Sequence, residues 1–195
     1  MEEIKTLIHQ WALDLGFQAV GYSNLDLSEH EDYLNTWLTN GFHGSMAYMN
    51  RNQALRISPS HLLAGSISAI TLRLDYLPEG EHQRIRKTLE SKDTAYISRY
   101  ALGRDYHKVI RNKLKRLANQ INDYINLQKL GPFYARACTD SAPILEKHLA
   151  EKSGLGWIGK NTLLLNRSAG SWFFLGELLT NLPLTQPAKR PSNHC

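Results

Sequence analysis

The feature that most constrains the fold is an apolar stripe in the middle of the chain. Its members recur at intervals of four, three, four and four residues: Ile110, Leu114, Leu117, Ile121 and Ile125. This spacing places them on one face of an α-helix, which we expect to run from Asp105, its N-cap, to about Leu127. A long helix with a single apolar face must bury that face, so the rest of the chain has to supply a packing layer.

The remaining sequence predicts both strands and helices. Apolar or alternating segments predict strands at 17–22, 67–77, 95–100, 133–139, 162–165 and 172–179. Helical spacing predicts helices at 3–15, 31–40, 44–53 and from Pro143 to about Lys152, whereas the polar segment 79–93 reads as a surface excursion. We therefore expect an α+β (or α/β) domain, with a mixed β-sheet of about five strands flanked by helices.

Composition and the N-terminal sequence indicate the cellular compartment in which the protein works. Hydrophobic residues make up 42% and charged residues 21% of the 195 residues, which is ordinary for one globular domain. No apolar run approaches the ~20 residues that a membrane helix needs, and the N-terminus has acidic residues where a signal peptide would be basic. The only cysteines are Cys138 and Cys195. We expect a cytoplasmic protein that works in a reducing compartment and does not enter a membrane.

The domain is expected to span residues 1–181. The last segment, 182–195 (LPLTQPAKRPSNHC), contains three prolines and has no periodicity, which is typical of a linker.

Asp140 is the first candidate for chemistry. It follows one predicted strand and precedes a helix, so its carboxylate would stand at a sheet edge, where an apolar setting would favour proton donation. The alternative is that Asp140 serves only as a helix N-cap.

A basic segment is the second candidate. Residues 104–116 (RDYHKVIRNKLKR) hold six Lys or Arg against one Asp, within a chain of net charge +5. Such a stripe attracts phosphates. The alternative is a solvated helix face.

A glycine-rich turn, SGLGWIGKN at 153–161, is the third candidate. It has G-x-G-x-x-G spacing but follows a helix and precedes a strand, the reverse of a dinucleotide fingerprint. Lys160 and Asn161 could hold a polar ligand, or the segment could be a simple turn. The histidines His43, His107 and His148 lack zinc-ligand spacing, and Cys138 reads as a buried small residue.

Three long blocks carry a resemblance to a known family. SRYALGRDYHKVIRNKL (98–114), DSAPILEKHLAEKSGLGWIGKNTLLLN (140–166) and GSWFFLGELLTNLPL (170–184) resemble the matching blocks of epoxyqueuosine reductase, and RISPSHLLAG (56–65) fits as well. The resemblance runs from about residue 3 to the end of the chain.

The resemblance implies a flavin-reductase-like N-terminal domain that binds cobalamin, followed by a ferredoxin-like domain with two 4Fe-4S clusters. Such an enzyme reduces epoxyqueuosine to queuosine at the wobble position of tRNA, with electrons that an external donor supplies through the clusters. The resemblance also implies that this chain is the cobalamin and substrate module, and we expect it to be a monomer.

The family's functional positions map onto this sequence. The resemblance makes Asp140 the proton donor. If Asp140 is only a helix cap, Tyr106 and His107 are the next candidates for the acid. The positions that match cobalamin contacts are Arg56, Ser98, Asp140, Lys160, Asn161 and Leu164. For tRNA attraction we single out Arg111, Lys115 and Arg116 on the basic helix.

The sequence departs from the family at its end. Cys195 matches the first cysteine of the C-x-x-C-x-x-C cluster signature, and one thiolate cannot hold a four-iron cluster. We therefore expect either a chain truncated before the iron–sulfur domain or a function that needs a second polypeptide. A non-catalytic cobalamin-binding module and a tRNA-binding domain remain the rival hypotheses.

Overall fold

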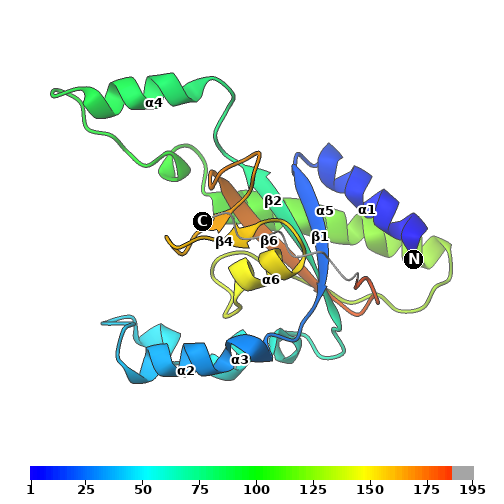
Figure 1. The fold of residues 1–195 in the computed structure, drawn as a ribbon. Helices are drawn as coiled ribbons and strands as arrows, with labels where there is room; N and C mark the ends of the chain where they lie inside the picture. The colour runs from blue at the N-terminus through cyan, green and yellow to red at the C-terminus, as the bar shows by residue number, and fades with distance from the viewer. Residues whose placement is uncertain (186–195) are drawn as a thin grey trace.

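The computed structural model describes residues 1–185 and is built on a four-stranded antiparallel sheet (Figure 1). Its strands are β1 (Ala19–Asn24), β2 (Ser68–Asp75), β6 (Phe173–Thr180) and β3 (Ala135–Cys138), in that spatial order. A separate hairpin pairs β4 (Trp157–Ile158) with β5 (Leu164–Leu165). The two central strands, β2 and β6, are therefore far apart in sequence and tie the two halves of the chain together.

Two helices cover one face of this sheet. They are α1 (Glu2–Asp14) and the long α5 (Tyr106–Leu127), whose five stripe residues are all at most 2% exposed. They pack with Ile70, Leu72 and Leu178 of the sheet into the largest core cluster. The Asp105 side chain accepts a hydrogen bond from the His107 main-chain N–H at 3.0 Å, which confirms Asp105 as the N-cap.

A glycine lets α5 lie directly on the central strand β6. A Cβ atom at Gly176 would stand 2.7 Å from Cγ2 of Ile110 and 3.2 Å from Cδ1 of Leu114. Such distances leave no room for a methyl group unless the helix moves away. Gly176 therefore sets the depth at which α5 sits, and with it the position of the first turn of the helix.

The opposite face of the sheet carries α6 (Glu146–Lys152), drawn in yellow in front of the strands in Figure 1. Its residues Leu149 and Ala150 are fully buried. A Cβ atom at Gly21 would lie 2.5 Å from the main-chain oxygen of Ser153, so a second glycine admits the end of this helix. This face also buries polar groups, which bear on the site described below.

The remaining helices lie outside these layers. α2 (Glu31–Thr39) and α3 (Gln53–Ile57) form a small cluster of their own with Leu34, Leu38 and Ile57. α4 (Glu81–Glu90) has no buried residue and projects from the body in Figure 1. Short 3-10 helices occur at Ser28–His30, Ala47–Met49, Pro59–Leu62 and Arg99–Ala101. No helix within residues 1–185 is long and apolar enough to cross a membrane.

The α+β class with a sheet flanked by helices is confirmed, but several details differ from expectation. Every strand pairing is antiparallel, so the sheet is not mixed. The segment 95–100 is not a strand: it is mostly exposed and leads into the 3-10 helix that begins at Arg99. The expected excursion at 79–93 contains α4, and the glycine-rich turn contains β4. Most of the expected linker, from residue 186 on, lies outside the described residues.

Gly176→Ala is expected to lower the free energy of unfolding by about 1–3 kcal/mol, because the new methyl group would overlap α5. Chemical denaturation of the variant and the parent chain measures the difference. In a double-mutant cycle, Ile110→Ala should relieve part of the loss, because it opens space where the methyl group would stand. Additive costs in the cycle would contradict this account of the contact.

Candidate active site

Asp140 lies in the loop between β3 and α6, and its side chain is exposed to solvent. Its φ angle is +53°, which is uncommon for a residue other than glycine, and its side chain is 59% exposed. α6 begins only at Glu146, with Leu145 as its N-cap residue. The alternative of a simple helix cap is therefore wrong for Asp140. The expected apolar setting is not present either, because most of the carboxylate faces outward.

Two side chains from the first turn of α5 hold the Asp140 carboxylate. The Tyr106 hydroxyl donates a hydrogen bond to Oδ2 at 2.8 Å, and His107 Nε2 lies 2.8 Å from the same oxygen. The other ring nitrogen of His107, Nδ1, lies 2.9 Å from Oδ1 of Asp105. The three residues Asp105, His107 and Asp140 thus form a chain in which one imidazole bridges two carboxylates.

This chain sets the protonation of the imidazole. Hydrogen bonding to Asp140 raises the pKa of His107, and the Asp105 bond adds to this effect against the opposing effect of burial. Burial, helped by the Asp140 hydrogen bond, raises the pKa of Tyr106. Tyr106 therefore stays a phenol that can donate, and His107 keeps its proton to a higher pH than an isolated histidine.

Two glutamates, one on α6 and one on β6, have raised pKa values. Burial raises the pKa of Glu146 to about 7, and the charge of Asp140 adds to the shift. Although part of the Glu146 residue is exposed, its Oε1 atom is shielded from solvent. Glu177, in the middle of β6, is fully buried, and burial raises its pKa as well. The sequence analysis did not identify either residue.

Cys138 pairs directly with Glu177 across the sheet and is itself buried. Burial raises the pKa of its thiol to about 12. A thiol in this state is a poor nucleophile, as expected for a buried structural cysteine.

Stacked aromatic rings form a wall beside the carboxylate. Tyr106 stacks on His107 at 3.9 Å and on Phe174 at 4.2 Å between ring centroids, and Phe174 meets Tyr76 at 4.6 Å. A hollow of about 360 Å³ opens next to this wall. Its lining residues are Tyr76, Arg84, Arg99, Tyr100, Leu102, Arg104, Tyr106 and Phe174. Rings and guanidinium groups together suit a flat ligand that carries negative charge.

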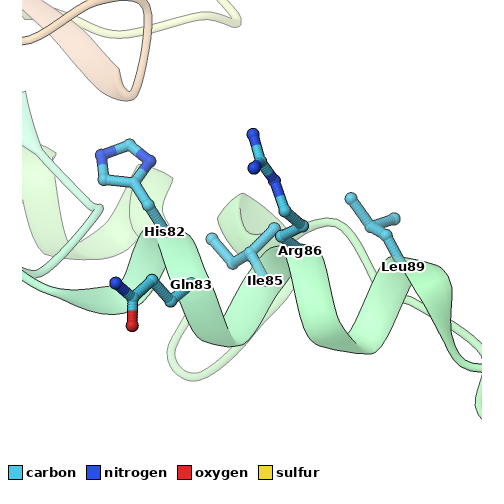
Figure 2. Close-up of a pocket in the computed structure, with 5 residues that line it drawn as sticks. All are labelled: His82, Gln83, Ile85, Arg86 and Leu89. Atoms are coloured by element: carbon cyan, nitrogen blue, oxygen red, sulfur yellow. The ribbon is translucent and has the colours of Figure 1, made fainter.

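A larger hollow of about 430 Å³ lies elsewhere, along α4 (Figure 2). Its lining residues are His82, Gln83, Ile85, Arg86 and Leu89, all from this one helix. A surface formed by a single helix lacks the convergent groups of a catalytic site. The hollow beside Asp140 is therefore the better candidate.

The expected cobalamin contacts lie on separate segments of the chain. Arg56 is buried, and its Nε has no hydrogen-bond partner among the described residues; its neighbour Ile57 packs in the cluster that Leu145 joins. Ser98 is exposed and precedes the 3-10 helix whose Tyr100 lines the hollow. Among residues 1–185, no hydrogen bond joins Arg56, Ser98 or Lys160 to Asp140.

The glycine-rich turn is the third of these segments. Lys147 at the start of α6 donates to the main-chain oxygen of Thr162 at 2.6 Å and so ties the β4–β5 hairpin to this helix. Lys160 and Asn161 are exposed, whereas the Leu164 side chain is buried, so Leu164 could offer a ligand only its main chain. A Cβ atom at Gly156 would lie 2.2 Å from the Leu165 oxygen. The hairpin itself therefore requires this glycine, which agrees with the alternative of a simple turn.

An unsatisfied buried guanidinium nitrogen, exposed polar side chains and an aromatic hollow are groups that can contact a ligand with a flat face and polar edges. Among residues 1–185, no group of three or more His, Cys, Asp or Glu is placed to hold a metal ion. Cys195, the expected cluster ligand, lies outside the described residues.

The basic candidates divide into two kinds. Arg111, Lys115 and Arg116 are all exposed on α5. Arg111 also reaches the site, because its Nη2 donates to the Ser141 hydroxyl at 3.4 Å. Lys113 differs, since it is partly buried and bonds the main-chain oxygen of Leu15. The basic face therefore begins beside Asp140 and continues along the helix.

Comparison with known proteins shows which sequences this chain resembles. A family model described as epoxyqueuosine reductase QueG, DUF1730, matches residues 56–141. The epoxyqueuosine reductase of Pseudomonas aeruginosa is 50% identical over 188 residues, which cover 96% of this chain and 50% of that protein. The Escherichia coli enzyme is 47% identical over 197 residues and is matched over 100% of this chain and 50% of its own length. The chain thus spans about half the length of these curated relatives.

Solved structures agree. Epoxyqueuosine reductase from Streptococcus thermophilus superimposes with a TM-score of 0.77 at 27% identity, over 97% of this chain and 48% of that chain. An epoxyqueuosine reductase crystallised with an epoxyqueuosine-modified tyrosine tRNA stem loop gives 0.78 at 22% identity, over 100% and 49% of the two chains. A reductive dehalogenase gives 0.50 at 15% identity, over 94% and 20%, and shares only the fold.

The fold and site therefore define an α+β domain with an exposed carboxylate held beside an aromatic hollow. Over nearly its whole length the chain is similar to about half of each of these epoxyqueuosine reductases.

Several site residues were missed by the sequence analysis. Glu177 carries a visible signal, since it is the single carboxylate in the apolar strand WFFLGELLT. Glu146 has no such signal, because an acidic residue in the first turn of a helix is common. Phe174 packs against the core cluster and also lines the hollow.

The pKa of His107 is expected to lie above that of an unperturbed histidine and to fall when Asp140 is changed to Asn, because the Asp140 hydrogen bond is the main cause of the shift. Titration of the imidazole signals by NMR measures this pKa. His61, which is exposed, serves as the internal control and should not respond. An unchanged His107 pKa in Asp140→Asn would show that the bond is absent in solution.

Proposed function

We propose that this chain is the cobalamin- and substrate-binding module of an epoxyqueuosine reductase, and that Asp140 delivers a proton to the epoxide oxygen. The observation that carries the proposal is the placement of Asp140, exposed beside an aromatic hollow and held by Tyr106 and His107 at 2.8 Å. An alkoxide is a poor leaving group unless it is protonated, so a positioned acid is needed.

His107 explains how an exposed carboxylate could act as an acid. In the open site, an imidazolium beside Asp140 stabilises the ionised carboxylate. A bound cofactor and substrate would cover the pair and remove water. In a less polar setting a neutral pair costs less than an ion pair, so the proton would move from His107 Nε2 to Asp140 Oδ2. Tyr106 would keep the carboxyl group oriented through its own hydrogen bond.

Cobalamin, when bound, would supply the reducing electrons. A reductive dehalogenase whose structure suggests a mechanism for B12-dependent dehalogenation has the same fold, which supports a corrin site in this domain. Arg56 would offer its unsatisfied guanidinium nitrogen to a polar edge of the ligand, and Ser98, Lys160 and Asn161 would contribute exposed donors. Leu164 would contribute its main chain only.

A tRNA substrate is supported by the relative crystallised with a modified tRNA stem loop. In this chain the exposed cations Arg111, Lys115 and Arg116 follow α5 away from Asp140. Lys and Arg side chains along such a line can track a phosphate backbone. Arg111 would bind closest to the modified base, because it contacts Ser141 beside the catalytic carboxylate.

The test starts with cobalamin alone. Adding it to the chain should change its visible absorption spectrum and retain it on gel filtration. No spectral change and no retention at high cobalamin concentration would contradict the cofactor assignment.

Asp140→Asn is expected to keep the fold and cobalamin binding and to lower single-turnover epoxide reduction by about 10²–10⁴-fold, because an amide cannot donate the proton. The assay uses the chain with cobalamin, titanium(III) citrate as reductant and an anticodon stem loop carrying epoxyqueuosine. The chemical reductant is needed because two cysteines cannot hold a four-iron cluster. Asp123→Asn, an exposed carboxylate on α5, is the matched control. Near-normal activity of Asp140→Asn would mean that Asp140 is not the proton donor, and Tyr106 or His107 would then be the candidate.

Replacing Arg111, Lys115 and Arg116 together by Ala should weaken stem-loop binding and reduce the log–log salt slope by up to about one unit for each phosphate that these side chains neutralise. Fluorescence anisotropy at several salt concentrations measures both quantities. A control triple of Arg86, Lys87 and Lys92 removes the same charge from the α4 region. Equal effects of the two triples would indicate general charge attraction. An unchanged slope after the α5 substitutions would show that these three side chains neutralise no phosphate and form only a solvated helix face.

A further inference from the structure

The imidazole of His107 is held at both edges by carboxylates. On one edge Nδ1 lies 2.9 Å from Oδ1 of Asp105, and on the other Nε2 lies 2.8 Å from Oδ2 of Asp140. A neutral imidazole carries one ring proton, which either nitrogen can hold. The hydrogen bond that each nitrogen makes therefore decides which of them is protonated.

Asp105 is the carboxylate that stays ionised. Its Oδ1 also accepts from the His107 main-chain N–H at 3.0 Å, and protonation would weaken this helix cap. The hydrogen bond to the His107 side chain lowers the pKa of the Asp105 carboxyl. The side chain is 46% exposed and lines a hollow of about 400 Å³ with Arg104 and Lys108, so water reaches it. An ionised carboxylate has no proton to give, so Nδ1 must carry the proton in the 2.9 Å contact.

The Asp140 edge then holds a second proton. With Nδ1 protonated, a neutral ring turns the Nε2 lone pair toward Asp140, and an ionised Asp140 would meet it with a lone pair of its own at 2.8 Å. A proton between the two atoms removes this repulsion. It lies either on Nε2, as an imidazolium beside a carboxylate, or on Oδ2, as a carboxylic acid beside a neutral imidazole.

Without Asp105, another form could fill the same 2.8 Å contact. A neutral imidazole could place its single proton on Nε2 and donate it to an ionised Asp140, which leaves Nδ1 bare. The N–H of a neutral imidazole is far too weak an acid to protonate a carboxylate. The atoms would keep their places, but the pair would hold no acidic proton.

We propose that Asp105 is a positioning residue that fixes the tautomer of His107, so that the Asp140–His107 pair holds one acidic proton at neutral pH. A carboxylate on Nδ1 has the same effect on the imidazole of serine-protease triads. When a ligand covers Asp140, the proton moves to Asp140 and not to Asp105, because Asp105 keeps its water and its cap. The inference rests on the proposed role of Asp140 as the acid, whereas the tautomer can be observed without substrate or cofactor.

The other titratable groups around the ring do not take this role. Tyr106 stacks on His107 at 3.9 Å and donates its hydroxyl to Asp140, so it does not bond the ring nitrogens. Glu146 on α6 interacts with the charge of His107, and no hydrogen bond joins these two residues within residues 1–185. Asp105 is therefore the residue to change.

The first experiment reads the tautomer from two-bond ¹H–¹⁵N correlation spectra of the chain with its eight histidines labelled with ¹⁵N. His107→Gln assigns the signal. The spectra are taken in an Asp140→Asn background, where the amide can donate to Nε2 as a protonated carboxyl group would. There we expect the neutral ring to carry its proton on Nδ1. Adding Asp105→Ser should move the proton to Nε2, because serine still caps the helix but is too short to replace the carboxylate at Nδ1.

Asp123→Ser is the matched control, because it removes one exposed carboxylate from the same helix. It should leave the proton on Nδ1. A ring protonated on Nε2 with Asp105 present, or the same tautomer with and without Asp105, would overturn the inference.

The second experiment compares single-turnover reduction by Asp105→Ser and the parent chain at several pH values, with titanium(III) citrate as reductant. At about pH 7.5 Asp105→Ser should be slower by at least about tenfold, because most of its rings hold the wrong tautomer. The ratio should return toward one at about pH 5, where the imidazolium forms without Asp105. A displaced site would not recover in acid, so an equal loss at every pH, or no loss at about pH 7.5, would reject the tautomer role.

The two proposals fail separately. An active Asp140→Asn would reject Asp140 as the acid and leave the measured tautomer standing. An inactive Asp140→Asn, together with a tautomer that ignores Asp105, would reject the positioning role alone.

Discussion

The contact between α5 and the central strand β6 is the constraint on which the rest of this structure depends. Gly176 lets Ile110 and Leu114 sit at a distance that any side chain would block, and the apolar stripe of α5 then fixes the rotation of the helix. Because the helix is rigid, its first turn can only stand at the edge of the sheet where β3 ends. Tyr106 and His107 reach Asp140 for this reason. The cluster of Asp105, His107 and Asp140 is thus positioned by packing more than by its own hydrogen bonds, which are exposed and individually weak.

The two faces of the sheet have different chemistry. The face beneath α1 and α5 is apolar, with Ile70, Leu72 and Leu178 in one large core. The face beneath α6 buries Ser23, Thr71 and Glu177, whose polar side-chain atoms have no partner among the described residues. Stability is therefore concentrated on one face, and the other tolerates groups that cost free energy. Such a division is typical of folds that keep a functional site on a stable scaffold.

Much of the scaffold could be predicted because its signals are local. The stripe of α5, its Asp105 cap and the strand β2 each depend on neighbours in sequence, and all three are confirmed, although β2 is buried on both faces over its first six residues. Strand directions depend on distant pairings, so the sheet was expected to be mixed. α4 has no apolar face to bury, which is why its segment read as an excursion. In the site, Asp140 could be found at a strand end, but its contacts with Tyr106 and His107 could not, because the tertiary fold alone brings these segments together.

Asp105 uses a single oxygen for two tasks. Its Oδ1 accepts from the His107 main-chain N–H, which starts the helix, and lies 2.9 Å from Nδ1 of the same residue, which orients the ring. The beginning of the helix and the working end of the imidazole are therefore one cooperative unit. When the first turn frays, the ring is released at the same moment, so the exchange rate of one backbone amide reports how often the site is assembled. The orientation of the His107 ring can thus be followed through the hydrogen bond of its own main chain.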